Sequence, residues 1–238
     1  MMKKVTFLTI VTLVTLGAAT PALAATAKNS DADITLTEDN HPDGPLRISK
    51  TTNIEFGVDS ISGSDKSYYA HYLGDAEKNA DDKYRPNYMQ VIDNRGTNQG
   101  WSLQVSNDAF KGKNEKNEDV TLDNAQLVMT STVTQKNNVD KDTQAVLAND
   151  ELAVDPAGWT YFANVKVNSS AATIATAKAG NGMGVNNIYF GDVADAASTN
   201  EDLASKNRSI ELQIPGISTK SKTKYTSTLT WTLTDDPA

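Results

Sequence analysis

Short runs of β-forming residues recur along this chain of 238 residues and constrain its fold more than any other feature. Thr, Val and Ile supply much of each run, and Gly, Asn and Asp fill the stretches between them, as in strands separated by turns. Long amphipathic helical periodicity is missing, and the best helical candidate is the short segment 144–152. We therefore expect an all-β protein, either a β-sandwich or a related Greek-key-like arrangement. The expected strands are 46–50, 53–58, 87–92, 101–106, 125–134, 161–167, 187–193, 209–214 and 225–234.

The connections are long for a minimal sandwich. Residues 60–85 carry several tyrosines amid charges, 111–119 form a charged loop, and the Gly-rich stretch 179–184 should turn sharply. Long insertions on a rigid sheet are where binding surfaces tend to be built, although they can also be solvated connections without a partner. Residues 53–57 match 187–191, which indicates either two related halves or two strand ends of similar chemistry.

A Trp-x-Leu motif occurs twice, each time inside an expected strand. Residues 225–234 alternate Thr or Ser with larger residues and contain Trp231-Thr232-Leu233. The other copy is Trp101-Ser102-Leu103. Because side chains alternate between the two faces of a strand, each Trp shares one face with its Leu, and the residue between them lies on the other.

These two motifs resemble those of the WxL family, secreted surface proteins of low-GC Gram-positive bacteria. Other members open with a Gly-x-Leu-x-Ile strand followed by a Phe-Gly. The corresponding residues here are Gly44-Pro45-Leu46-Arg47-Ile48 and Ile54-Glu55-Phe56-Gly57. The resemblance covers nearly all of the chain after its first residues. It implies non-covalent attachment to the cell wall, usually ascribed to peptidoglycan, in company with membrane-anchored partner proteins, and it implies no enzymatic activity.

The first residues predict export. Residues 1–24 read as a signal peptide, with a basic start, a short apolar run and Ala22-Leu23-Ala24 before the cleavage site. A flexible lead-in over 25–43 and a wall-associated domain over 44–238 follow. No later stretch is apolar enough to span a membrane. The chain contains no Cys and shows no covalent sorting signal, so we expect a secreted protein that stays on the cell surface by binding.

The chemistry available argues against an enzyme. His41 and His71 are the only histidines and lack metal-ligand partners at standard spacing. Without Cys, a papain-like peptidase is excluded. Carboxylates are numerous, so a glycosidase is not excluded by counting, but no pair stands out. Acidic clusters such as 38–40 offer oxygen ligands without matching a calcium loop. We predict no cofactor and no metal.

The candidate binding residues are aromatic. Trp101 and Trp231, with Leu103 and Leu233, either anchor the core or stack on glycan rings, and we expect at least one tryptophan in the core. Further candidates for a stacking platform are Trp159, Tyr68, Tyr69 and Tyr72.

The net negative charge of the chain argues against several classes of binding partner. A net charge of −8 argues against nucleic acid, anionic membrane and plain electrostatic adhesion to anionic wall polymers. Wall binding would then rest on stacking and hydrogen bonds, or on bridging cations. The leading hypothesis is a non-catalytic protein that binds peptidoglycan or another wall glycan, together with other surface proteins. The alternative is a structural subunit that docks on a membrane- or wall-anchored protein and does not itself bind glycan. A wall glycosidase ranks third.

Overall fold

The computed structural model describes residues 32–73, 84–131, 133–136, 158–191 and 206–236. These residues form fourteen strands and contain no α-helix, which confirms the all-β prediction. The expected signal peptide (1–24) and helical segment (144–152) lie outside the described residues. The chain divides into a unit of residues 1–36 and a compact unit that begins at Thr37 and contains every strand. The predicted domain limits at 24 and 43 stay predictions.

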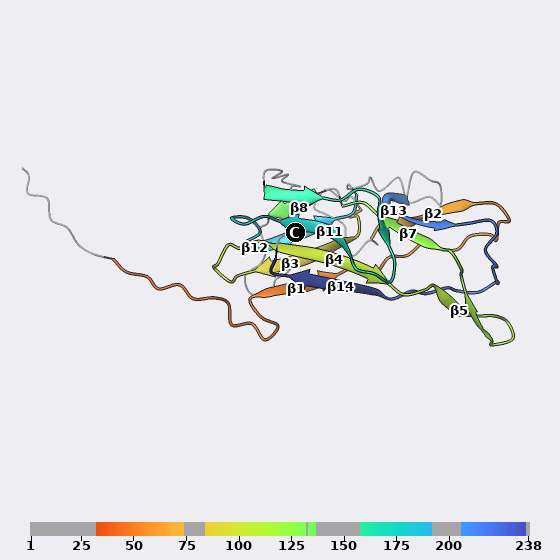
Figure 1. Cartoon of the computed structure of the whole chain (residues 1–238), viewed down its shortest axis with the longest axis horizontal. Coiled ribbons are helices and arrows are strands. Elements are labelled where there is room, and N and C mark those ends of the chain that lie inside the picture. The colour runs from red at the N-terminus through yellow and green to blue at the C-terminus, as the bar shows by residue number, and fades with distance from the viewer. Residues whose placement is uncertain (1–31, 74–83, 132, 137–157, 192–205, 237–238) are drawn as a thin grey trace, which may run out of the picture. The chain divides into compact units, whose positions relative to one another are not determined.

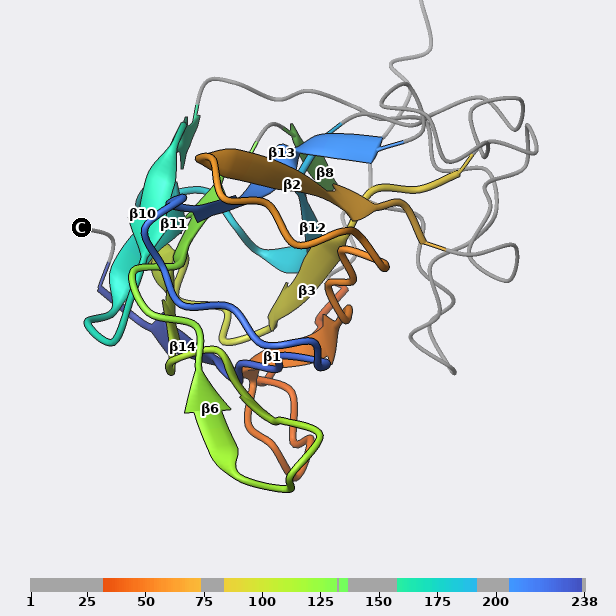
Figure 2. The same ribbon diagram turned by 90° about the vertical axis from the view of Figure 1, so that its right-hand side faces the viewer.

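The strands build three four-stranded antiparallel sheets and one hairpin (Figures 1 and 2). The β1 sheet has the order β1 (Leu46–Thr51), β3 (Tyr88–Asp93), β12 (Gly184–Tyr189) and β8 (Val133–Lys136). The β2 sheet has the order β10 (Val165–Val167), β7 (Gln126–Met129), β13 (Lys206–Ile214) and β2 (Lys66–His71). The β4 sheet has the order β14 (Leu229–Thr234), β4 (Trp101–Asn107), β11 (Ala172–Ala177) and β9 (Trp159–Tyr161). The hairpin pairs β5 (Lys111–Lys113) with β6 (Asp119–Thr121).

The inner faces of all three sheets contribute to one hydrophobic core, as in a β-sandwich. Each sheet supplies fully buried side chains, among them Met89 of the β1 sheet, Leu127 of the β2 sheet and Trp101 of the β4 sheet. Alternation explains this directly, because β4 turns Trp101, Leu103 and Val105 into the core and Gln104 and Ser106 to the other face. The apolar positions of the sequence therefore fix which face of each strand joins the core.

The two Trp-x-Leu motifs lie on neighbouring strands. β14 pairs antiparallel with β4, with Leu233 opposite Leu103 and Trp231 opposite Val105. Figure 1 shows these two strands side by side. Segments more than 100 residues apart in sequence thus form one ladder.

Several expected strands differ in extent or partner. The run predicted at 125–134 is two strands in different sheets, β7 and β8. The run predicted at 161–167 is divided as well: Tyr161 ends β9, and Val165–Val167 form β10 in another sheet. Residues 53–58 belong to no named strand, whereas 187–189 lie in β12, so these similar segments occupy different structural settings. The expected internal similarity of two halves stays a prediction.

Four strands arise where the sequence indicated loops or nothing. β2 lies inside the expected insertion 60–85. Its mixed polar and aromatic sequence did not predict a strand, and pairing with β13 makes it one. β5 and β6 occupy the expected charged loop, and the ion pair Lys113–Asp119 at 2.8 Å joins them across the hairpin. β11 is rich in Ala, a weak strand former, and is held between β4 and β9.

Candidate wall-binding surface

The outer face of the β4 sheet carries a grid of hydroxyl and amide side chains. The register places Thr234, Ser102, Thr176 and Thr160 in one row across β14, β4, β11 and β9. Neighbouring strands in a sheet lie about 4.8 Å apart, so this row repeats a hydroxyl group at roughly that spacing. We call the whole set the hydroxyl face; its members are Ser102, Gln104, Ser106, Thr160, Thr173, Thr176, Thr230, Thr232 and Thr234.

The hydroxyl face is most accessible over β14. Thr230 and Thr232 are exposed and Gln104 is half-buried, whereas Ser102 and Thr176 are each about 1% exposed. Hydroxyl groups both donate and accept hydrogen bonds, and the amide of Gln104 adds both functions. The face can therefore bond to hydroxyl and N-acetyl groups of a carbohydrate in many orientations.

The Trp-x-Leu motifs explain why this face is polar and the opposite one apolar. Trp101 and Leu103 are fully buried, and the Trp101 indole Nε1 donates to the Gly182 carbonyl at 3.2 Å. Trp231 and Leu233 are half-buried and pack against the same core. The residue between each Trp and Leu consequently lies on the hydroxyl face, and no solvent reaches the Trp101 ring.

The other aromatic candidates are dispersed over the molecule. Trp159 is half-buried and packs edge-on against Trp101, with ring centroids 5.1 Å apart. Tyr68 and Tyr69 are consecutive in β2 and so face opposite sides of their sheet, and the Arg208 guanidinium lies 5.6 Å from the Tyr69 ring centroid. Tyr72 follows β2 and is half-buried. Tyr68, Tyr69 and Tyr72 therefore do not share one platform.

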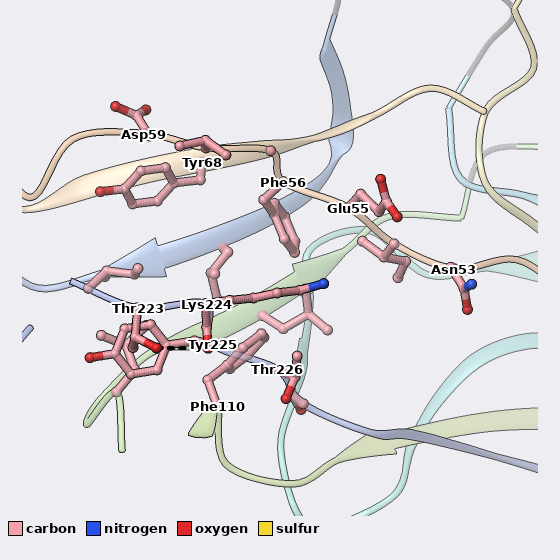
Figure 3. A pocket seen from close by; sticks show the side chains of 18 of the residues that line it. Asn53, Glu55, Phe56, Asp59, Tyr68, Phe110, Thr223, Lys224, Tyr225 and Thr226 are labelled. Atoms are coloured by element: carbon pink, nitrogen blue, oxygen red, sulfur yellow. Dashed lines mark hydrogen bonds between the residues drawn. The ribbon is translucent and has the colours of Figure 1, made fainter. Parts of the chain in front are cut away.

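A large groove lies beside the end of β14. Its volume is about 1190 Å³, and Trp231 and Tyr68 both line it. One wall is residues 52–58, which we call the upper wall, and the other is residues 220–228, the lower wall. Figure 3 shows aromatic side chains from both walls and from the floor around this space. The side chains that form the floor are Tyr68, Phe110, Leu122, Leu127, Leu212, Ile214 and Trp231.

Two carboxylates near the groove, Asp108 and Asp59, make structural hydrogen bonds and ion pairs. Asp108 accepts a hydrogen bond from the backbone N–H of Thr228 at 2.7 Å, and this bond lowers the pKa of its carboxyl group. Asp59 pairs with the Lys66 ammonium at 2.8 Å, which lowers the pKa of Asp59. Both carboxylates thus have structural partners, and the bond from Thr228 holds the backbone of the lower wall.

The histidines have ordinary surroundings. His41 Nδ1 accepts a hydrogen bond from the Asp43 backbone, and both histidines are exposed. Within the described ranges no group of three His, Asp or Glu side chains is arranged to hold a metal ion. The same ranges contain no helix that is long and apolar enough to cross a membrane. The predictions of no metal and no cofactor stay predictions.

Comparison with protein families identifies the class. Residues 20–237 match the family model described as "WxL domain surface cell wall-binding". The protein is therefore a cell-surface, wall-associated protein with an all-β fold. The chain belongs to the WxL family, whose model describes a wall-binding domain and not an enzyme. No curated protein and no solved structure matches the chain significantly.

Sequence reasoning did not select most of the hydroxyl face. The sequence predicts Ser102 and Thr232 on the strand face opposite the motif Trp and Leu, but the binding residues that it suggests are the aromatic ones. The alternation of Thr and Ser through 225–234 was the signal that could have extended the face along β14. Thr173 and Thr176 could not be added, because β11 was not recognised as a strand.

Proposed function

We propose that the protein is a non-catalytic surface protein that attaches non-covalently to peptidoglycan through the hydroxyl face of its WxL domain. The observation that supports this proposal is the accessible part of the hydroxyl face, where the exposed Thr230 and Thr232 of β14 lie beside the half-buried Ser106 and Gln104 of β4. Both Trp-x-Leu motifs contribute to this sheet, which links the family's defining residues to one surface.

The hydroxyl face suits a polymer better than a small ligand. Its accessible part follows β14 and the neighbouring edge of β4, and a single hydrogen bond contributes only about 0.5–1.5 kcal/mol net, so useful affinity needs several bonds along an extended glycan. A rigid sheet presents these groups without ordering a loop on binding, which lowers the entropic cost.

The test is co-sedimentation with insoluble peptidoglycan stripped of teichoic acids and proteins. We expect the wild-type chain to sediment, and Thr230→Val with Thr232→Val to lower the affinity roughly tenfold, because two hydroxyl groups are lost without changing shape or strand propensity. The matched control is Thr51→Val with Thr121→Val, two exposed strand residues outside the hydroxyl face. Equal binding by both double variants would show that the hydroxyl face is not the binding surface.

The groove favours a second candidate function, a structural subunit that docks on a membrane- or wall-anchored protein. Its floor is apolar and its walls are extended backbone, as in sites that take up a strand from another protein. Sedimentation with intact cell walls, but not with stripped peptidoglycan, would support this candidate over direct glycan binding.

A further inference from the structure

The two walls of the groove are extended like strands but do not pair with each other. Side chains alternate between half-buried and exposed positions along the upper wall, where Thr52, Ile54 and Phe56 point inward. The lower wall alternates in the same way through Thr223 and Tyr225. Such alternation is the pattern of residues in a sheet, and it indicates an extended backbone through residues 52–56 and 224–228; Gly57, with φ +76°, ends it in the upper wall, and a bend at 222–223 ends it in the lower wall.

The backbone hydrogen bonds of each wall point away from the groove. Glu55 of the upper wall accepts a bond from the His71 N–H at 2.7 Å, on the side of β2. Thr226 of the lower wall exchanges two bonds of 2.8 Å with Lys111, on the side of β5. Among the described residues no backbone hydrogen bond joins the walls. Each wall thus offers an unsatisfied edge toward the groove, and such edges readily accept another strand.

The size and floor of the groove also fit an added strand. Small-molecule sites usually measure about 300–1,000 Å³. The volume of about 1190 Å³ is larger, and the groove runs between two extended segments. An extended peptide placed there would bury alternate side chains on Phe110, Leu127 and Leu212 of the floor.

We infer that the groove accepts residues 32–37 of a second copy of this chain as an added β-strand. This segment reads Ala-Asp-Ile-Thr-Leu-Thr, the same alternation of aliphatic residues with Thr that forms β14. Its large side chains are unburied, with Ile34 82% and Leu36 83% exposed. Period-2 geometry directs Ile34 and Leu36 onto the apolar floor, with Thr35 and Thr37 on the solvent side.

Charge complementarity supports this occupant. Asp33 and Glu38 make residues 32–38 acidic, and the lower wall carries several lysines. Lys222 forms only an exposed ion pair with Glu115 at 3.4 Å, and Lys224 has no ion pair among the described residues. An acidic strand beside the lower wall would bring the Asp33 carboxylate, on the solvent side of the added strand, toward these exposed ammonium groups.

The chain geometry requires the strand to come from another copy. Asp39 is held at the start of β1, where its backbone N–H bonds to the Asn94 carbonyl at 3.1 Å and its carboxylate accepts from Arg47 at 2.8 Å. The groove begins at the other end of β1, which is about 20 Å long for six residues. Three residues of extended chain reach only about 11 Å, so Leu36 cannot enter its own groove. Donation to another copy gives a closed dimer where two copies exchange strands, and rings or open chains where each copy donates to the next.

The test is sedimentation velocity of the secreted chain over a wide concentration range. We expect concentration-dependent dimers and longer oligomers, and Ile34→Asp with Leu36→Asp to weaken association by roughly 100-fold or more, since two apolar side chains no longer bury. Thr35→Asp with Thr37→Asp is the matched control, because it adds the same charge to the solvent side and should leave association largely intact. A wild-type chain that stays monomeric, or two double variants that associate equally, would overturn the inference.

A second measurement locates the contact in the groove. A synthetic peptide of residues 30–40 should bind the monomeric Ile34→Asp/Leu36→Asp variant and change the fluorescence of Trp231, which lines the groove. We expect Lys224→Glu, a change at an exposed side chain, to weaken peptide binding roughly threefold to tenfold, while a peptide carrying Ile34→Asp does not bind. No binding of the wild-type peptide would exclude the strand exchange and leave the proposal for peptidoglycan binding untouched.

Discussion

At the scale of single residues, the two motif tryptophans have different tasks. Trp101 is fully buried and hydrogen-bonded to Gly182, whereas Trp231 is half-buried, contacts Phe190 at a centroid distance of 5.8 Å and lines the groove. The equal spacing of the two motifs therefore hides unequal burial. Trp101 stabilises the fold, and Trp231 joins the core to an accessible surface.

This difference predicts unequal losses of stability. Trp101→Ala should lower the free energy of unfolding by about 3–5 kcal/mol, because it leaves a large cavity among three sheets. Trp231→Ala should cost less, about 1–2 kcal/mol, since Trp231 is only partly buried and its removal leaves a space open to the groove. Urea unfolding of both variants measures the two values. Equal losses would contradict the burial difference.

A glycine beside Trp101 makes a second prediction. Gly182 has φ +83°, and a Cβ there would lie 2.5 Å from Trp101 Nε1 and 2.7 Å from the Ala177 Cβ. Gly180 has nearly the same φ of +84° but open space around it. Gly180→Ala should therefore cost only the left-handed backbone strain, about 1–2 kcal/mol. Gly182→Ala should cost about 1–3 kcal/mol more, from overpacking. Thermal and urea unfolding of this pair isolate the steric part.

At the scale of elements, β14 and the segment before it differ in how they are bound to the rest of the molecule. Leu229–Thr234 form a full ladder with β4. Residues 220–228 form no such ladder and are held by individual hydrogen bonds, among them Thr226 with Lys111 and Thr228 with Asp108, and by packing of Tyr225 against the core. One continuous alternating run thus supplies a strand of the hydroxyl face and the lower wall of the groove. Changes in the lower wall should affect the groove more than the fold.

The bond between Asp108 and Thr228 predicts a dependence on pH. Its carboxylate form is bonded in the folded state, so its folded pKa lies below the ordinary value of 3.8. The stabilisation is present above pH 3.8 and is lost as the pH falls through the lower folded pKa. In Asp108→Asn the melting temperature should fall less steeply below that pH. Asp123→Asn, a change of an exposed aspartate without such a bond among the described residues, should keep the wild-type slope.

At the scale of the whole molecule, nearly all sheet neighbours are distant in sequence. Among the described strands only β5 and β6 are both consecutive and paired. β2 pairs with β13 and β4 pairs with β14, so the sheets close only after most of the chain is available. Folds dominated by such non-local pairings fold slowly, and unpaired edges are exposed to other copies meanwhile.

The overall charge predicts how wall binding responds to salt. The net charge of −8 opposes ionic attraction to anionic wall polymers, and the hydroxyl face binds through uncharged groups. The amount of wild-type chain that sediments with stripped peptidoglycan should change less than about twofold between low and moderate salt. A steep loss with salt would instead assign binding to the lysines of the lower wall or to bridging cations.

Sequence alone determined the class of fold and the orientation of its main strands. Period-2 alternation in Trp101–Leu103 and 225–234 assigned each side chain to a face, because that period is a property of the extended backbone itself. Turn-forming residues between short apolar runs excluded a helical protein. The same local rules placed Ser102 and Thr232 on the opposite face from the motif tryptophans.

Tertiary structure alone decided which strands are neighbours, and hence where the surfaces lie. Pairing between β14 and β4 depends on contacts more than 100 residues apart, which no local pattern encodes. The same pairing aligns Thr234 with Ser102. β11 adds Thr176 to the row; its alanines are weak strand formers, so its strand depends on pairing with its neighbours. The groove likewise exists only because 52–58 and 220–228 are held apart by other elements. Local sequence decides which face of a strand each side chain lies on, and long-range packing decides which strands become neighbours.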